Sequence, residues 1–285
     1  MIEVLEPGML TTVQDLGRPG WAHLGVPPSG ALDLPAFTLA NRLVGNAEGA
    51  AALETTLRGP TLRFHRSATI AVTGAPVTAH TRTRPIAMNA VEFIAAGDIL
   101  TVGWALTGAR TYIAIRNGLR LPLTLGSVST DLLTGLGPPP LATGTCIPFG
   151  TAAVAMPVVD LAPVARLTPS PRLAIIPGPR EDWFTATALD ELCGTSWTIG
   201  PDSNRVGLRL QGPPLTWSRD AELLSEGITA GALQVPPSGR PILLLRDHPA
   251  TGGYPVIAVL QSDYLHHAAQ LPPGSTIRFA MSSRT

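Results

Sequence analysis

Short apolar runs closed by glycine and proline dominate the pattern along this chain. Apolar and polar residues alternate within Thr61–His65 and Ser275–Ala280, as they do in strands that bury one face. Turn residues end such runs about every 8–12 residues, which is typical of an all-β sandwich or barrel. We therefore expect strands in further runs, namely Ala68–Thr73, Ile99–Val102, Thr111–Ile115, Leu173–Ile176, Ile242–Leu245 and Thr276–Phe279.

Three segments depart from this pattern and have helical spacing. The first, Asp33–Gly45, begins with a capping aspartate and a first-turn proline and ends at a glycine. The second, Arg180–Cys193, has apolar residues four apart and is followed by glycine. The third, Ser262–Leu271, is short, and we expect Ser262 as its cap. The sequence thus predicts a mostly β protein with about three short helices.

Internal similarity points to two lobes. Gly25–Gly30 resembles Gln234–Gly239, and a second motif is also repeated. The two motifs occur in opposite orders in the two halves of the chain. A duplication and a chance similarity of turn sequences therefore both stay open. We expect two β-barrel-like lobes, 1–165 and 166–285, joined within the proline-rich stretch 135–171.

Charge and composition exclude several classes of function. Twenty basic and twenty acidic residues give a formal net charge of zero, which argues against nucleic acid and anionic membranes as partners. All the basic residues are arginine. Without lysine there is no Walker A phosphate loop, no pyridoxal Schiff base and no covalently attached biotin.

The termini and cysteines indicate a soluble protein. Met1–Gly8 carries acidic residues where a signal peptide needs a basic patch and an apolar run. The uncharged stretch Leu132–Val159 is interrupted by glycine and proline, unlike a membrane span. Cys146 and Cys193 lie far apart and belong to no CxxC pair, so we expect no metal site. We expect a cytoplasmic protein with reduced thiols.

Two polar turns are candidates for a functional site. Asp15 and Arg18 flank a glycine turn and either form a weak surface ion pair or face a ligand. The loop Asp247–Tyr254 follows an apolar strand, so its backbone N–H groups can face an anion or oxyanion. The competing interpretation is a tight turn that needs positive φ at Gly252 or Gly253.

Three side chains are further candidates for acid–base chemistry or anion binding. His248 has an ordinary pKa near neutrality and suits a general base. Glu226 follows an apolar pair, so it is either a buried carboxylate with a raised pKa or the cap of a turn. Arg205 can hold a carboxylate or phosphate with its planar fork, or be solvated.

Long motifs along the chain resemble the allophanate hydrolase subunit 2 family, also called KipA-like or the C subunit of 5-oxoprolinase. The same module forms part of the carboxyltransferase region of urea carboxylase. The match runs in one order from about residue 4 to about 280. The motifs are Thr11–Arg18, Gly25–Asp33, Ala40–Asn46, Leu53–Glu54, Gly59–Pro60, Asn204–Leu210, Ser225–Gly227, Gln234–Pro236, Thr251–Pro255 and Asp263.

The resemblance implies cyclophilin-like barrels and a partner chain, the KipI-like B subunit of the complex. It often implies a third component too, the A subunit. In that family the assembled enzyme opens 5-oxoproline to glutamate with hydrolysis of ATP, which we expect the complex rather than this chain alone to bind. One departure is Val256, which stands where relatives often have lysine.

Two alternatives to the hydrolase stay open. One is transfer of a carboxyl group from carboxybiotin to urea or a similar amide. The other is a non-enzymatic KipA-type regulator that binds a KipI-like kinase inhibitor.

We expect the site in a cleft between the lobes. Catalysis would need a group that activates water and donors that hold phosphate and oxyanion. We assign the first task to Glu226, Asp247 or His248. The substrate-binding candidates are Asp15, Arg18, Ser29, Arg205, Gln234, Thr251, Gly252, Gly253 and Tyr254.

Overall fold

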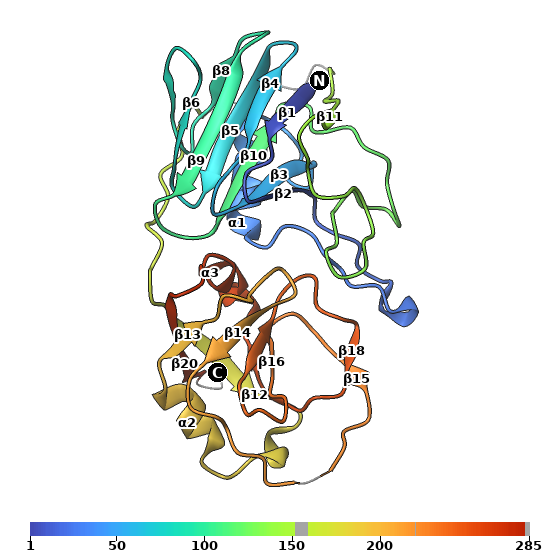
Figure 1. The fold of residues 1–285 in the computed structure, drawn as a ribbon, viewed down its shortest axis with the longest axis vertical. Helices are drawn as coiled ribbons and strands as arrows, with labels where there is room; N and C mark the ends of the chain where they lie inside the picture. Colours follow the sequence, from blue (N-terminus) through green and yellow to red (C-terminus); the bar gives the residue numbers. More distant parts are fainter. Residues whose placement is uncertain (152–158, 220, 283–285) are drawn as a thin grey trace. The chain divides into compact units, whose positions relative to one another are not determined.

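The structure is a computed structural model that describes residues 1–151, 159–219 and 221–282 (Figure 1). These residues form twenty β-strands and three α-helices, which confirms the mostly β prediction. The chain divides into two compact units. The first comprises Met1–Arg18, Ser29–Asp131 and Gly135–Leu167; the second comprises Pro19–Pro28, Leu132–Thr134 and Thr168–Thr285.

The first unit contains two antiparallel sheets. One has the strand order β11-β1-β4-β9-β6-β7 and the other β2-β3-β10-β5-β8. The first sheet consists of β1 (Ile2–Glu6), β4 (Thr61–Phe64), β6 (Val77–His80), β7 (Pro85–Ile86), β9 (Ile99–Ala105) and β11 (Cys146–Ile147). The second consists of β2 (Leu10–Gln14), β3 (Ala52–Thr56), β5 (Ala68–Gly74), β8 (Glu92–Ile94) and β10 (Arg110–Ile115). The predicted strands in this half are confirmed.

Strand β10 is buried on both faces, which explains its nearly continuous apolar sequence. Ile113 and Ile115 join the main core with side chains from both sheets. Tyr112 and Ala114 belong to a second cluster, which includes residues of the helix α1 (Leu34–Leu43). The helix therefore covers the outer face of the sheet that contains β10.

Helix α1 starts and ends where its sequence predicts. The Asp33 carboxylate accepts a hydrogen bond of 3.0 Å from the backbone N–H of Ala36 and caps the N-terminus. Such a cap contributes about 1 kcal/mol. Phe37 and Ala40 are fully buried on the face that meets the sheet. Gly45 follows the helix with φ of 72°, a conformation that costs glycine little.

A buried hydrogen-bond network fixes the entry to α1. The Tyr112 hydroxyl donates to Glu54 Oε2 at 2.8 Å and accepts from the backbone N–H of Asp33 at 2.7 Å. Glu54 Oε2 also accepts from the backbone N–H of Leu32 at 2.9 Å. Burial, followed by the charges of Glu54 and Asp33, raises the pKa of Tyr112 well above its ordinary value.

Replacing Tyr112 by phenylalanine is expected to lower the free energy of unfolding by about 1–3 kcal/mol, because the Asp33 N–H loses its buried acceptor. The raised pKa of Tyr112 predicts a second effect. The unfolded tyrosine loses its proton at pH about 10 and the folded one does not, so wild-type stability falls as pH rises above about 10. Urea unfolding at pH 7 and at alkaline pH measures both effects. A variant as stable as wild type at pH 7 would contradict the network's role.

The second unit contains a closed barrel with the strand order β12-β19-β16-β17-β14-β13-β20 (Figure 1). Parallel pairing of β12 with β20 closes it, and the other neighbours are antiparallel. The barrel strands are β12 (Arg172–Pro177), β13 (Trp197–Ile199), β14 (Gly207–Gln211), β16 (Ala232–Gln234), β17 (Ile242–Leu244), β19 (Val256–Leu260) and β20 (Thr276–Met281). A separate ribbon pairs β15 (Glu226–Gly227) with β18 (Thr251–Gly252). The strands predicted in this half are confirmed.

Two of the three predicted helices are shorter than expected. The segment predicted as one helix over 180–193 forms a 3-10 turn η2 (Glu181–Trp183) and then α2 (Ala188–Gly194). Between them Phe184 is extended and pairs with Trp217, which it meets edge-to-face at 6.5 Å. Aromatic packing therefore overrides the helical spacing.

The third predicted helix forms a 3-10 turn η3 (Ser262–Tyr264) followed by α3 (Leu265–Ala269). Gln261, not Ser262, precedes the turn as its cap. Among the described helices none is long and apolar enough to cross a membrane.

Candidate functional site

Asp15 organises the segment 127–129 within the first unit. Its carboxylate accepts hydrogen bonds from Ser127 Oγ at 2.5 Å and Ser129 Oγ at 2.6 Å. It also accepts from the backbone N–H groups of Val128 at 2.8 Å and Gly17 at 2.7 Å. Four donors satisfy this carboxylate, so the geometry gives it a structural task.

Arg18 and Ser29 hold the same part of the chain. The Arg18 guanidinium is buried and donates to the carbonyl oxygens of Thr124 and Ser129. Ser29 has φ of 51° and donates its hydroxyl to the Thr130 carbonyl at 3.1 Å. Within the described residues Asp15 and Arg18 each bind this segment rather than one another, so the first of the two interpretations, a weak surface ion pair, is wrong.

Arg205 and Asp247 form a bidentate ion pair in the second unit. Arg205 Nε lies 2.9 Å from Asp247 Oδ2, and Nη2 lies 3.0 Å from Oδ1. Both side chains are fully buried. Asp247 also accepts from the backbone N–H of Leu132 at 3.2 Å. Arg205 is therefore not solvated, and the carboxylate that its planar fork holds is that of Asp247. His248 beside them is buried, with Nδ1 2.8 Å from the Pro249 carbonyl.

Glu226 pairs with Arg180 instead. Two contacts join the side chains, one of them 3.0 Å between Arg180 Nε and Glu226 Oε2. The Glu226 side chain is 31% exposed. The hydrogen bond from Arg180 lowers the pKa of Glu226, so of the two interpretations that the sequence allows, the buried carboxylate with a raised pKa is wrong. Glu226 is ionised at neutral pH and can accept a proton.

Of the two adjacent glycines, Gly252 lies in strand β18 of the ribbon β15–β18 and Gly253 directly follows it. Neither Gly252 nor Gly253 has positive φ, so the interpretation as a tight turn is wrong. A Cβ on Gly252 would lie 2.5 Å from Ile228 Cδ1 and 2.9 Å from Gln234 Nε2. The Gln234 amide donates to the Tyr254 carbonyl at 3.2 Å. A Cβ at Gly252 would therefore displace the ends of the Ile228 and Gln234 side chains, where the ribbon lies close to strand β16.

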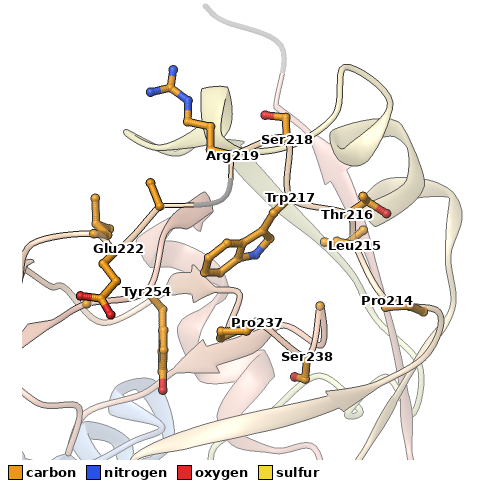
Figure 2. Close-up of a pocket in the computed structure, with 14 residues that line it drawn as sticks. Pro214, Leu215, Thr216, Trp217, Ser218, Arg219, Glu222, Pro237, Ser238 and Tyr254 are labelled. Atoms are coloured by element: carbon orange, nitrogen blue, oxygen red, sulfur yellow. The ribbon is translucent and has the colours of Figure 1, made fainter.

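The loop ends at an open pocket of about 1010 Å³. Gly253 and Tyr254, both predicted from the sequence, line it, and Tyr254 is 45% exposed. In Figure 2 the Trp217 indole lies at the centre of the labelled side chains, and the Arg219 guanidinium points away from it. The lining residues are Pro214–Arg219, Ala221–Leu223, Pro237–Gly239, Gly253 and Tyr254.

This pocket can hold a ligand with one apolar face and one polar edge. Trp217 and the prolines Pro214 and Pro237 supply apolar walls. The Glu222 carboxylate and the Tyr254 phenol supply polar groups, and further hydroxyls come from Thr216, Ser218 and Ser238. Concave sites of mixed apolar and polar lining are typical for small molecules. Arg219, which also lines the pocket, forms an ion pair with Asp182.

A comparison with protein families identifies the module. The family model "Carboxyltransferase domain, subdomain A and B" matches residues 24–281. The chain belongs to this family. The carboxyltransferase match covers strands of both units, and it confirms the resemblance seen in the sequence motifs.

Known proteins similar to this carboxyltransferase chain fall into two groups. The chain is 37% identical over 286 residues to the C subunit of 5-oxoprolinase from Escherichia coli K12, covering 99% of this chain and 92% of the relative. It is 33% identical to urea amidolyase of Lachancea kluyveri, covering 97% of this chain but 17% of that protein.

Solved structures share the fold. The crystal structure of Kluyveromyces lactis urea amidolyase matches with a TM-score of 0.91 and 33% identity, covering 99% of this chain and 19% of that protein. The crystal structure of TTHA0988 matches with a TM-score of 0.90 and 35% identity, covering 98% of this chain and 55% of that chain. The chain thus spans about half of TTHA0988 and a fifth of urea amidolyase.

The carboxyltransferase module contains site residues that sequence reasoning missed. Arg180, the partner of Glu226, lies 46 residues away along the chain. Trp217, Glu222 and Ser238 line the pocket from segments without strand or helix periodicity. Ser238 belongs to the repeated Val-Pro-Pro-Ser-Gly sequence, but it is exposed whereas Ser29 is buried. That repeated sequence is the available signal, and it points to Ser29 instead.

Proposed function

We propose that this chain is a subunit of an ATP-dependent amide hydrolase, most simply a 5-oxoprolinase that opens 5-oxoproline to glutamate. One observation carries the proposal. The chain matches 92% of the length of the C subunit of 5-oxoprolinase, whereas it matches only 17% of a urea amidolyase. A chain that corresponds to a whole subunit fits an enzyme of separate subunits. Its partners would be a KipI-like chain and a third component, the A subunit.

The reaction needs activation of a stable lactam. Transfer of the γ-phosphoryl group of ATP to the lactam carbonyl oxygen would release ADP and create a better electrophile. A first water then attacks the carbonyl carbon, and the C–N bond breaks with a proton delivered to nitrogen, which leaves a γ-glutamyl phosphate. A second water cleaves this acyl phosphate to give glutamate and inorganic phosphate. The protein must hold the oxyanion and remove a proton from water.

We assign the proton acceptor to Glu226. Among the three expected catalytic residues, Glu226 is the one whose side chain reaches solvent, at 31% exposure. Its lowered pKa keeps it ionised at neutral pH. Asp247 is fully buried and bound by Arg205, and His248 is also buried, so we assign both to positioning the adjoining loop. The pocket lined by Gly253 and Tyr254 would receive the substrate. Glu226 does not line this pocket; it pairs with Gly252, the neighbour of Gly253, in the ribbon β15–β18.

ATP is proposed to bind with the help of a partner chain. The sequence has no lysine and no phosphate loop. The N-terminus of α1, a ten-residue helix, is closed by the Asp33 carboxylate, which would repel a phosphate. The described residues therefore do not fit a triphosphate at that helix end.

A second candidate rests on the family match itself. The description of the family model is carboxyltransferase, and urea amidolyase shares the fold at a TM-score of 0.91. In that case the chain would bind carboxybiotin carried by another protein and move the carboxyl group to an amide. The missing lysine excludes biotin attached to this chain and leaves this role open.

Co-expression with a KipI-like chain and the third component tests the proposal. We expect a stable complex that buries roughly 2,000 Å² or more, as permanent complexes do. Glutamate should form from 5-oxoproline and ATP with the assembled complex and not with this chain alone. A chain that stays monomeric beside its partner would contradict the proposal, as would glutamate formation by the chain alone. Carboxybiotin-dependent carboxylation of urea would favour the second candidate.

A further inference from the structure

A small pocket in the first unit is lined by two arginines. Its volume is about 240 Å³. Arg66 and Arg116 line it together with hydroxyl and amide side chains, and the described residues of its lining include no aspartate or glutamate. In a chain with equal numbers of acidic and basic residues, an all-cationic pocket indicates an anionic ligand. The lining residues are Arg66–Thr69, Phe93, Arg116, Asn117 and Phe149–Thr151.

Arg66 is held in place before any ligand arrives. Its guanidinium carbon lies 3.9 Å from the centroid of the Phe149 ring. Nη2 donates to the carbonyl oxygens of Phe149 and Gly150, the latter at 2.7 Å. Within the described residues Arg66 forms no ion pair, so its Nε and Nη1 groups keep donors for another acceptor.

Neighbouring groups add donors around the same space. Ser67 and Thr69 contribute hydroxyls from the start of β5, and Asn117 contributes its amide from the turn after β10. Asn117 Oδ1 is buried and has no hydrogen-bond partner in the described part of the chain. Asn117 Nδ2 donates to the Gly150 carbonyl oxygen at 3.4 Å, the same oxygen that Arg66 Nη2 contacts. Burial, followed by the charge of Arg66, lowers the pKa of the Met1 amino group.

We propose that this pocket binds a small oxyanion, a phosphate or a carboxylate, on the fork of Arg66 with support from Arg116 and Ser67. Planar guanidinium groups recognise both anions through paired N–H donors. The volume of about 240 Å³ lies below the range of about 300–1,000 Å³ that is typical of drug-sized ligands, so the ligand is small. The exposed ring of Phe93 offers a surface for a short carbon chain. The site uses none of the residues assigned to the proposed reaction.

Titration of the full chain with inorganic phosphate and, separately, with L-glutamate tests the proposal by calorimetry at low ionic strength. Ser67→Asp places a carboxylate in the pocket at an exposed position, and we expect it to weaken binding at least about tenfold without loss of folding. Ser170→Asp adds the same charge at another exposed serine and serves as the control.

The outcomes show which anion binds and whether it binds in this pocket. Binding of phosphate alone identifies a phosphate site, and binding of glutamate alone identifies a carboxylate site. If neither probe binds, or if Ser67→Asp binds as well as Ser170→Asp, the proposal is wrong. Both variants should keep the wild-type melting temperature in the absence of anion.

Discussion

Replacing Arg205 by methionine is expected to lower the free energy of unfolding by about 3–5 kcal/mol, because it leaves the buried Asp247 carboxylate without its bidentate partner. Both side chains are 0% exposed, so water cannot solvate the remaining charge. Asp247 also accepts the backbone N–H of Leu132, so a displaced carboxylate would release the segment 132–134 as well. Urea unfolding at pH 7 measures the loss.

Two further variants separate this buried pair from ion pairs in general. The double variant Arg205→Met with Asp247→Leu removes both charges, and we expect it to recover part of the lost stability. Arg63→Met breaks the exposed pair with Glu3, whose side chains are 40% and 25% exposed, and it should cost less than about 1 kcal/mol. A loss under about 1 kcal/mol for Arg205→Met would show that the ion pair does not hold this part of the unit.

The strands could be predicted because their pattern is local. In β4 the alternation of Thr61–Phe64 matches its alternating burial, and the capping signals of α1 are all within one helical turn of its ends. The prediction of one continuous helix over 180–193 is wrong for a non-local reason. Phe184 has good helical spacing, but its edge-to-face contact with Trp217 holds it extended.

Partners of the charged residues could not be predicted for a similar reason. Sequence motifs draw attention to Arg205, Glu226 and Asp247, and the structure describes all three in ion pairs. Which arginine meets which carboxylate depends on barrel register and on loops that no periodicity fixes. The position of segment 132–134 could not be predicted either, because it belongs to the second unit although the residues before and after it along the chain belong to the first.

Gly252 is a candidate for which the sequence leaves two interpretations open, an anion-binding loop and a positive-φ turn. The structure excludes the second, because Gly252 does not have positive φ. Its missing Cβ instead leaves room for the side-chain ends of Ile228 and Gln234. The pocket residue Trp217 has no comparable signal, since a lone aromatic residue in a loop is most often simply packed.

Replacing Glu226 by glutamine in the assembled complex is expected to lower kcat/KM at least ~100-fold, because the variant cannot accept a proton from water. The side chain keeps its size, so the pairing surface of β15 with β18 should survive. Glu48→Gln is the matched control: Glu48 also sits in an exposed arginine pair, with Arg42, and it takes no part in the proposed reaction. Unchanged activity per folded Glu226→Gln complex would make the residue structural.

The acid limb of the pH profile gives a second, independent reading of Glu226. In the wild type its pKa is lowered by the hydrogen bond from Arg180, so a base at this position stays ionised until the pH falls below that lowered pKa. Arg180→Gln removes the bond and lets the pKa rise toward its ordinary value, so activity should begin to fall at a higher pH as the solution is acidified. The Arg180–Glu226 pair also contributes a small amount to the free energy of unfolding. This contribution is present above the pKa of Glu226 in the unfolded protein and is lost as the pH falls through the lowered pKa of the folded protein, so stability and activity both decrease on acidification. An acid limb that does not move in Arg180→Gln would assign the proton acceptor to a different group, even if Glu226→Gln is inactive.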